Sequence, residues 1–205
     1  MLCTREQQTT VPETWSIPQQ APASDAAQGD LLDRLAAHTA NGDKLAFERI
    51  YGLLVDDLYG YVRGQCDDDP TAEDLLAEVF LRAWRSASRY RGGSRRYRRW
   101  IFAIAHNLVR DHWRARRRDL PLLDVASVHA EAAAEAATGE DEERRLKRAI
   151  AALTDEQRQV VALRYYSNMS HRDIAAIMGK REGAVRALLV RALRRMRKVM
   201  SDAAA

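Results

Sequence analysis

The sequence predicts an all-α protein of two small helical domains joined by a linker, with a helix-turn-helix in the C-terminal domain. Helix-forming residues such as Ala, Leu, Arg and Glu dominate the 205 residues, whereas Gly and Pro are scarce outside the N-terminus. Apolar residues recur every three or four positions, as on the buried face of a helix. Residues 119–141 lack this pattern and separate two regions that have it, so we interpret them as the linker.

The N-terminal domain is predicted over residues 29–118. It follows a tail, residues 1–28, that is rich in Gln, Thr, Pro and Ala and has no hydrophobic period, which indicates disorder. Two helices are expected over residues 31–63, with a break near residues 41–42. Their apolar positions share one face, so we expect this face to be buried.

Two further helices are expected in this domain. Thr71 and Asp74 form a T-x-x-D capping box, which predicts that a helix opens at this point. The glycine-containing segment 91–94 is then a loop, and it leads into a helix over about 96–118.

The second of these helices interleaves aromatic residues with arginines. Arginines bind phosphates and aromatic faces stack on unpaired bases, so the segment has the chemistry for single-stranded or partly opened DNA. We assign Trp100 to the core, whereas Tyr90, Tyr97 and Trp113 lie beside arginines and are candidates for stacking on bases.

Charge is strongly segregated, although the formal net charge is only +4. Residues 67–78 carry six acids and no base, residues 95–118 carry nine arginines against one acid, and residues 180–198 carry eight bases against one acid. Two basic blocks predict two contacts with a polyanion, and the acidic block predicts a basic protein partner. A solvated helix face is the alternative explanation for each block taken alone.

The C-terminal domain is predicted over residues 142–200. Capping boxes at 154–157 (T-x-x-Q) and 170–173 (S-x-x-D) indicate two helix starts. Residues 171–190 fit a helix-turn-helix, in which Gly179 supplies the positive φ of the turn. The helix after the first box is expected to bury Val160, Val161, Leu163 and Tyr165.

The second helix of this motif presents a largely basic outer face. In a helix-turn-helix the second helix enters the major groove, where arginines address guanine or hold phosphates. An ordinary antiparallel helix pair is the alternative. The residues predicted to face DNA are Arg181, Glu182, Arg186 and Arg191.

Several functional classes are disfavoured by the composition. Cys3 and Cys66 stand alone without a ligand at metal-binding spacing, and no phosphate-cradling glycine loop or catalytic triad order is present. We therefore expect no enzyme, no catalytic residue, no metal, no cofactor and no small-molecule substrate. The chain lacks an apolar run of membrane-spanning length and a signal-peptide pattern, which predicts a cytoplasmic protein without membrane insertion.

Four ordered blocks resemble the extracytoplasmic-function (group IV) sigma factors of bacterial RNA polymerase. The resemblance covers about residues 43–118 and 142–198. The blocks are Asp74–Trp84 (DLLAEVFLRAW), Trp100–Asp111 (WIFAIAHNLVRD), Leu153–Tyr165 and Glu182–Arg186 (EGAVR). This similarity implies that core RNA polymerase and promoter DNA are partners, and that an anti-sigma protein holds the chain inactive.

The resemblance assigns roles to individual residues. It implies that the polymerase-binding motif contains Asp74, Leu75, Glu78 and Phe80. The minus-ten helix would contain Asn107, Arg110, Asp111 and Arg114, with the loop around residues 91–96 holding a flipped base. From the charge pattern, the minus-ten backbone would be held nearby by Arg95, Arg96, Arg98 and Arg99. The helix-turn-helix would read the minus-thirty-five element.

The chain departs from the family pattern at a few positions. Ala77 stands where the polymerase-binding motif usually has Gln, and Ala184, Leu188 and Arg181 replace the usual residues of the recognition helix and its cap. The alternative function is a helix-turn-helix transcriptional regulator with a helical sensor domain. A sensor has no reason to carry an acidic helix followed by an aromatic and basic one.

Overall fold

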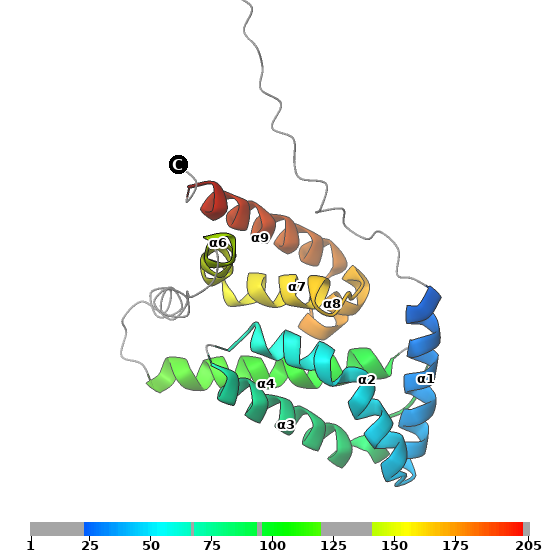
Figure 1. Cartoon of the computed structure of the whole chain (residues 1–205). Helices are drawn as coiled ribbons and strands as arrows, with labels where there is room; N and C mark the ends of the chain where they lie inside the picture. The colour runs from blue at the N-terminus through cyan, green and yellow to red at the C-terminus, as the bar shows by residue number, and fades with distance from the viewer. Residues whose placement is uncertain (1–22, 67, 94–95, 120–140, 203–205) are drawn as a thin grey trace, which may run out of the picture.

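The computed structural model describes residues 23–66, 68–93, 96–119 and 141–202. Every regular element in these ranges is helical, which confirms the predicted all-α class. The elements are α1 (Ala23–Ala40), α2 (Lys44–Arg63), α3 (Asp69–Arg85), the short 3-10 helix η2 (Ala87–Arg89), α4 (Tyr97–Asp119), α6 (Asp141–Ala151), α7 (Asp155–Tyr165), α8 (His171–Met178) and α9 (Glu182–Asp202). Figure 1 shows α1–α4 as one group of helices and α6–α9 as a second group stacked against it.

The N-terminal unit is held together by apolar stripes on α1, α2, α3 and α4. Leu54 and Leu58 of α2, Val79 of α3 and Ile101 of α4 are fully buried in one continuous core. Each buried side chain of this size contributes about 1.5–3 kcal/mol relative to its exposed state. α2 packs on α1 and α3, and α3 packs on α4, so α4 is fixed against the rest of the unit.

Side-chain caps set the starts of α2 and α3. The carboxylate of Asp43 accepts a hydrogen bond of 3.1 Å from the backbone N of Ala46. At α3 the cap is Asp68, which accepts from the backbone N of Thr71 at 2.8 Å and from its hydroxyl at 3.0 Å. The predicted Thr71–Asp74 capping box is therefore wrong. The helix begins earlier because Pro70 fits its first turn, where a missing N–H breaks no helical hydrogen bond.

The described helices differ from the predicted segments at the N-terminal tail and meet the predicted linker at its two ends. α1 begins at Ala23, so residues 23–28, predicted as the end of a disordered tail, are helical. This stretch contains three alanines and a glutamine, which favour a helix without any buried stripe. Residues 1–22 lie outside the described residues. So does the predicted linker, apart from its end residues: Asp119 belongs to α4 and Asp141 to α6.

The C-terminal unit contains the two predicted helix caps. Thr154 and Gln157 form a reciprocal capping box at α7, as predicted. At α8 the hydroxyl of Ser170 accepts from the backbone N of Asp173 at 3.1 Å and donates to its carboxylate at 2.6 Å. A small second core between α6 and α9 contains Leu153 and Met196.

One burial prediction in α7 is wrong. Val160 and Leu163 are fully buried and Val161 is partly buried, but Tyr165 is 40% exposed. Tyr165 follows Leu163 by two residues, which rotates its side chain about 200° around the helix, away from the core. At the end of a helix the hydrophobic pattern is a poor guide to which side chains are buried, because the chain changes direction there.

The two units pack against each other. α8 of the C-terminal unit contacts α4 of the N-terminal unit. The apolar core of α1–α4 continues into the core made by Leu163, Ile174 and Val185. α4 is therefore in contact with both units.

Candidate nucleic-acid interface

The start of α4 is fixed by a carboxylate from α1. Asp33 accepts hydrogen bonds from the backbone N of Arg96 at 3.2 Å and of Tyr97 at 2.9 Å, and from the hydroxyl of Tyr90 at 2.7 Å. The first turn of α4 contains no acid of its own, so Asp33 supplies both the cap and the negative charge that the helix N-terminus favours.

Sequence reasoning missed Asp33. The signal was a carboxylate inside the apolar stripe of α1, directly after the fully buried Leu32. Such a residue needs a buried partner, but its partners lie more than fifty residues away in the sequence. The burial of Tyr90 and its hydrogen bond to Asp33 both raise the pKa of its phenol, which keeps the hydroxyl available as a donor.

Most of the residues predicted to contact the minus-ten element lie on one exposed stripe of α4. Asn107, Arg110, Asp111 and Arg114 are all exposed, at spacings of three and four residues. Arg96 is exposed at the N-terminal end of the same stripe. The stripe is polar and mainly cationic, as a surface that contacts nucleic acid requires.

The remaining arginines of this set are in different surroundings. Arg98 is turned toward α2, where it pairs with Asp57 at 2.6 Å and its guanidinium lies 5.7 Å from the ring centre of Phe102. Arg99 pairs with Asp173 of α8 at 3.5 Å. Arg95 lies outside the described residues.

The prediction that Tyr97 and Trp113 stack on bases is wrong. Tyr97 is 1% exposed and Trp113 is 6% exposed, so both rings belong to the core. The indole N–H of Trp113 donates to the backbone carbonyl of Gln65 at 3.0 Å, which gives the buried polar atom its partner. Tyr90 and Trp100 are only partly buried, and their ring centres lie 5.2 Å apart.

These two rings belong to a cavity of about 340 Å³ at the N-terminal end of α4. The cavity is lined by four cationic and two aromatic side chains: Arg89, Arg91, Arg96, Arg99, Tyr90 and Trp100. An aromatic wall and several guanidinium groups suit an unpaired base together with its phosphates. The cavity coincides with the loop that the family resemblance associates with a flipped base.

The predicted polymerase-binding residues lie on α3. Asp74 is exposed, Leu75 is half-buried, and Glu78 pairs with Arg82 at 2.6 Å. Phe80 is 6% exposed, so its ring is part of the core. Its centre lies 4.6 Å from that of Tyr51, which is 46% exposed.

Some large apolar side chains of the same two helices are exposed. They belong to α2 and α3 and include Leu45, Tyr51 and Leu81. Exposed apolar side chains and carboxylates suit contact with a protein better than contact with DNA.

The helix-turn-helix has the predicted local geometry. Gly179 adopts φ 62° and ends α8, and Val185 and Leu188 are buried on the inner face of α9. Arg181 and Arg186 are exposed, and Arg186 forms an ion pair with the partly buried Glu182.

Further cationic side chains lie near the N-terminal part of α9 and on its other faces. Arg191 is exposed but points about 140° away from Arg186 around the helix, so the two do not share one face. Partial burial lowers the pKa of His171, as do the nearby Arg164 and Arg186.

The described residues were also searched for a metal site and for a membrane-spanning helix. Within them, no group of three or more His, Cys, Asp and Glu side chains is arranged to hold a metal ion. No helix in that part of the chain has the length and apolar character needed to cross a bilayer.

Family models match both units of the chain. The family described as Sigma-70 region 2 matches residues 50–119, which span α2 to α4. The family described as Sigma-70, region 4, matches residues 143–196, which contain the helix-turn-helix. The match to the N-terminal unit disfavours the alternative of a regulator with an unrelated sensor domain.

Two solved structures share the fold. The structure of CnrH in complex with the cytosolic domain of CnrY covers 84% of this chain and 99% of its own, with 22% identity and a TM-score of 0.65. The sigma factor RpoE in complex with the anti-sigma factor NepR, from Bartonella quintana, covers 76% and 96%, with 24% identity and a TM-score of 0.61.

Proteins of similar sequence support the family assignment. The ECF RNA polymerase sigma factor SigK of Mycobacterium tuberculosis is 28% identical over 174 residues, covering 81% of this chain and 91% of its own. The ECF RNA polymerase sigma factor BldN of Streptomyces coelicolor is 32% identical over 187 residues, covering 88% of this chain and 70% of its own. The chain therefore belongs to the extracytoplasmic-function family of RNA polymerase sigma factors, which bind core polymerase and direct it to promoter DNA.

Proposed function

We propose that the two units divide the work of promoter recognition. Residues 29–118 bind core RNA polymerase and open the minus-ten element, residues 142–200 read the minus-thirty-five element, and residues 119–141 link the two. The observation that carries this proposal is the exposed stripe of α4, which runs from a cavity rich in arginine and aromatic side chains through Asn107 to Arg114.

α4 has the chemistry required for DNA opening. Removing a base from the stack requires a few kcal/mol, about as much as stacking on an aromatic ring returns. Trp100 and Tyr90 provide such rings, and Arg96 provides a cation beside them. Asn107 and Asp111, one turn apart and both exposed, are the candidates for base edges.

α3 is the proposed polymerase contact. Asp74 and Glu78 lie one turn apart, and Leu75 lies between them in the sequence. The buried side chain of Phe80 contributes indirectly, because its ring packs against the exposed ring of Tyr51 and supports it. The wider surface is apolar and acidic, which suits a partner that is apolar and basic.

The helix-turn-helix is the proposed duplex-reading element. Arg186 sits near the N-terminal end of α9 and is well exposed, the position from which a recognition helix reaches base edges. Glu182 orients it through their ion pair. Arg181 and Arg191 contact DNA from other directions, which suits phosphates of the backbone.

An anti-sigma protein is a further proposed partner. The solved structures that share the fold include RpoE bound to the anti-sigma factor NepR. Exposed apolar residues on α2 and α3, among them Leu45, Tyr51 and Leu81, are candidates for contact with such an inhibitor. In this proposal catalysis belongs to the polymerase in the cytoplasm, and the chain contributes no catalytic residue.

The test is transcription by reconstituted holoenzyme. The full chain is mixed with core polymerase, a fragmented genomic library is transcribed, and the start sites are sequenced. We expect start sites that share upstream elements near minus ten and minus thirty-five and that disappear when the chain is omitted. Failure of the chain to associate with core polymerase, or start sites without common elements, would overturn the proposal.

A further inference from the structure

The connection between η2 and α4 carries two of the arginines that line the cavity. These are Arg91 and Arg96, and Tyr90 at the start of the connection supplies one of the two aromatic rings. The connection also contains Gly92 and Gly93, and glycine restricts the backbone less than any other residue. A connection of this composition needs contacts from other elements to hold one shape.

Asp33 of α1 supplies such contacts at both ends of the connection. Its Oδ1 accepts hydrogen bonds from the hydroxyl of Tyr90 at 2.7 Å and from the backbone N of Tyr97 at 2.9 Å. Its Oδ2 accepts from the backbone N of Arg96 at 3.2 Å. The first bond fixes the start of the connection, and the other two fix its end. One carboxylate therefore sets the position of the aromatic ring relative to the arginine.

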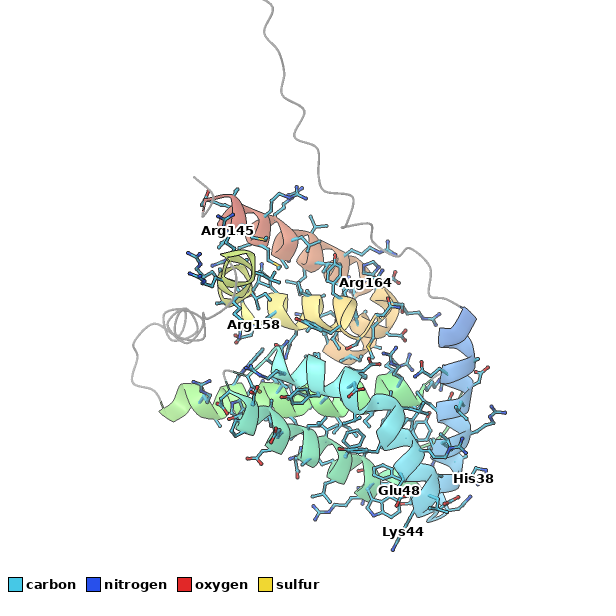
Figure 2. The ribbon with its side chains drawn as sticks, viewed as in Figure 1. His38, Lys44, Glu48, Arg145, Arg158 and Arg164 are labelled. Carbon is cyan, nitrogen blue, oxygen red and sulfur yellow. The ribbon has the colours of Figure 1, made fainter. Side chains whose placement is uncertain are left out.

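α1 is itself anchored in the core of the N-terminal unit. Leu32, next to Asp33, is fully buried, and α1 packs on α2, η2 and α4. Figure 2 shows His38, near the C-terminal end of α1, beside the start of α2, which is marked by Lys44. Because its helix is packed on three others, the carboxylate of Asp33 is a fixed point to which the connection is tied.

The side chain of Arg96 is placed by a second contact within the connection. A Cβ added at Gly93 would lie 2.8 Å from Cδ of Arg96 and 3.0 Å from its Nε, so this arginine would have to move. The backbone N of Arg96 also donates to the carbonyl of Gly93 at 3.1 Å. An added Cβ at Gly92, by contrast, meets nothing within 4 Å. Asp33 thus places Arg96 through its main chain, and Gly93 leaves room for its side chain.

We propose that Asp33 is a positioning residue for minus-ten recognition, which sets the preference for the unpaired base without touching DNA. The inference rests on the proposed function of the cavity as the place where that base is held. Contacts that tell one base from another need groups in fixed positions. Loosening the connection removes this fixed geometry but leaves the cationic charge, which attracts DNA of any sequence. Asp33 therefore contributes to selectivity more than to affinity.

The anchoring is measured first, on the full chain without DNA or polymerase. The backbone N–H of Tyr97 bonds to Asp33, so its hydrogen exchange reports this contact. Relative to core amides of the same chain, exchange at Tyr97 should be about tenfold faster in Asp33→Ala. It should change little in Asp33→Asn, whose amide oxygen is an acceptor in place of Oδ1. Unchanged exchange in Asp33→Ala would overturn the anchoring.

Selectivity is measured next, by transcription with reconstituted holoenzyme. The templates form a mixture in which each position of the mapped minus-ten element carries all four bases, and barcodes in the RNA give the yield from each. A base contact of ordinary strength gives roughly a 5- to 150-fold preference. We expect the parent chain to show such a preference at the position whose base is unpaired. Asp33→Ala should reduce it to about twofold or less there, the level of a site without a specific contact, and spare the other positions.

Leu32→Ala is the matched control for stability. It leaves a hole in the core one residue from Asp33, but it keeps the three hydrogen bonds of the carboxylate. A less stable chain gives less product on every template in the same proportion, so its base preferences should equal those of the parent. Two milder variants, Asp33→Asn and Tyr90→Phe, each lose one of the three bonds and should lose part of the preference at the same position.

A second pair of variants changes the cavity and leaves Asp33 in place. Gly93→Ala forces the side chain of Arg96 to move and should reduce the preference at the same position. Gly92→Ala is its control and should keep the preference of the parent. A reduced preference in Gly93→Ala but not in Asp33→Ala would leave base selection with the cavity and overturn the role of Asp33.

The outcomes separate this inference from the function on which it rests. Equal loss on all templates in Asp33→Ala, as in Leu32→Ala, would make Asp33 a purely structural residue and leave the sigma function intact. If Asp33→Ala does not fold, unchanged preferences in both Asp33→Asn and Tyr90→Phe would overturn the inference. A parent holoenzyme without any preference in the minus-ten element would instead overturn the proposed function.

Discussion

Replacing Asp33 with Ala should destabilise the N-terminal unit and loosen the start of α4. Removing a helix cap lowers stability by about 0.5–2 kcal/mol, and losing the carboxylate beside the helix N-terminus adds roughly 0.3–1 kcal/mol. The hydroxyl of Tyr90, which donates to Asp33 at 2.7 Å, loses its acceptor, for roughly 1–3 kcal/mol more. We therefore expect Asp33→Ala to lower the free energy of unfolding by about 2–6 kcal/mol.

The assay is urea unfolding of the full chain, followed by far-UV circular dichroism. Asp33→Asn keeps an acceptor oxygen but loses the charge, so it should lie between Ala and the parent chain. Tyr90→Phe removes only one donor and should lower stability by about 1 kcal/mol. The double variant Asp33→Ala/Tyr90→Phe should then lose less than the sum of the two single variants. A loss below about 0.5 kcal/mol for Asp33→Ala would refute this account of how α4 begins.

Three further predictions concern the other surfaces. Asp74→Arg and Glu78→Lys should each abolish pull-down of core polymerase while leaving the urea midpoint unchanged; retained pull-down by both would remove α3 as the docking helix. Arg186→Ala should weaken binding to the minus-thirty-five element by about 1–3 kcal/mol and relax its sequence preference, whereas equal weakening on all sequences would make it a phosphate contact. Burial, together with Arg110 and Lys180 and against the opposing effect of Glu156, lowers the pKa of His106 to about 4. Unfolding restores an ordinary pKa near 6.5, so the unfolded chain binds the proton more tightly, and this contribution to stability is present above about pH 6.5 and lost as pH falls toward 4. The urea midpoint should fall in that window and fall less in His106→Gln; the same pH dependence in both proteins would count against the buried position of His106.

The fold was largely readable from local sequence patterns. The three-to-four-residue apolar period, the box at Thr154–Gln157 and the glycine at 179 each depend on neighbours within one or two turns, and all are present in the structure. The start of α3 was predicted wrongly because the sequence offers two possible caps there, each with its two residues three positions apart. The pairing of Asp68 with Thr71 competes with that of Thr71 with Asp74.

The site was harder to predict because it depends on contacts between distant segments. Charge segregation located the basic helix, but could not tell that Arg98 turns inward to Asp57 or that Trp113 lies in the core. Asp33 acts on α4 across a separation that no local pattern spans. The ring of Tyr166 likewise packs beside Gly60 and Gly64 only once the two units are in contact.

The most direct test of the central claim, that the exposed stripe of α4 opens and reads the minus-ten element, is run-off transcription by holoenzyme carrying Asn107→Ala and Asp111→Ala together. Each reaction uses a fully duplex template and one with a pre-opened bubble that keeps the non-template sequence. We predict normal association with core polymerase but a strong loss of product on the duplex. Recovery on the bubble would assign these residues to opening, and a persistent, sequence-dependent defect would assign them to base reading. Full activity of the double variant on duplex DNA would contradict the claim.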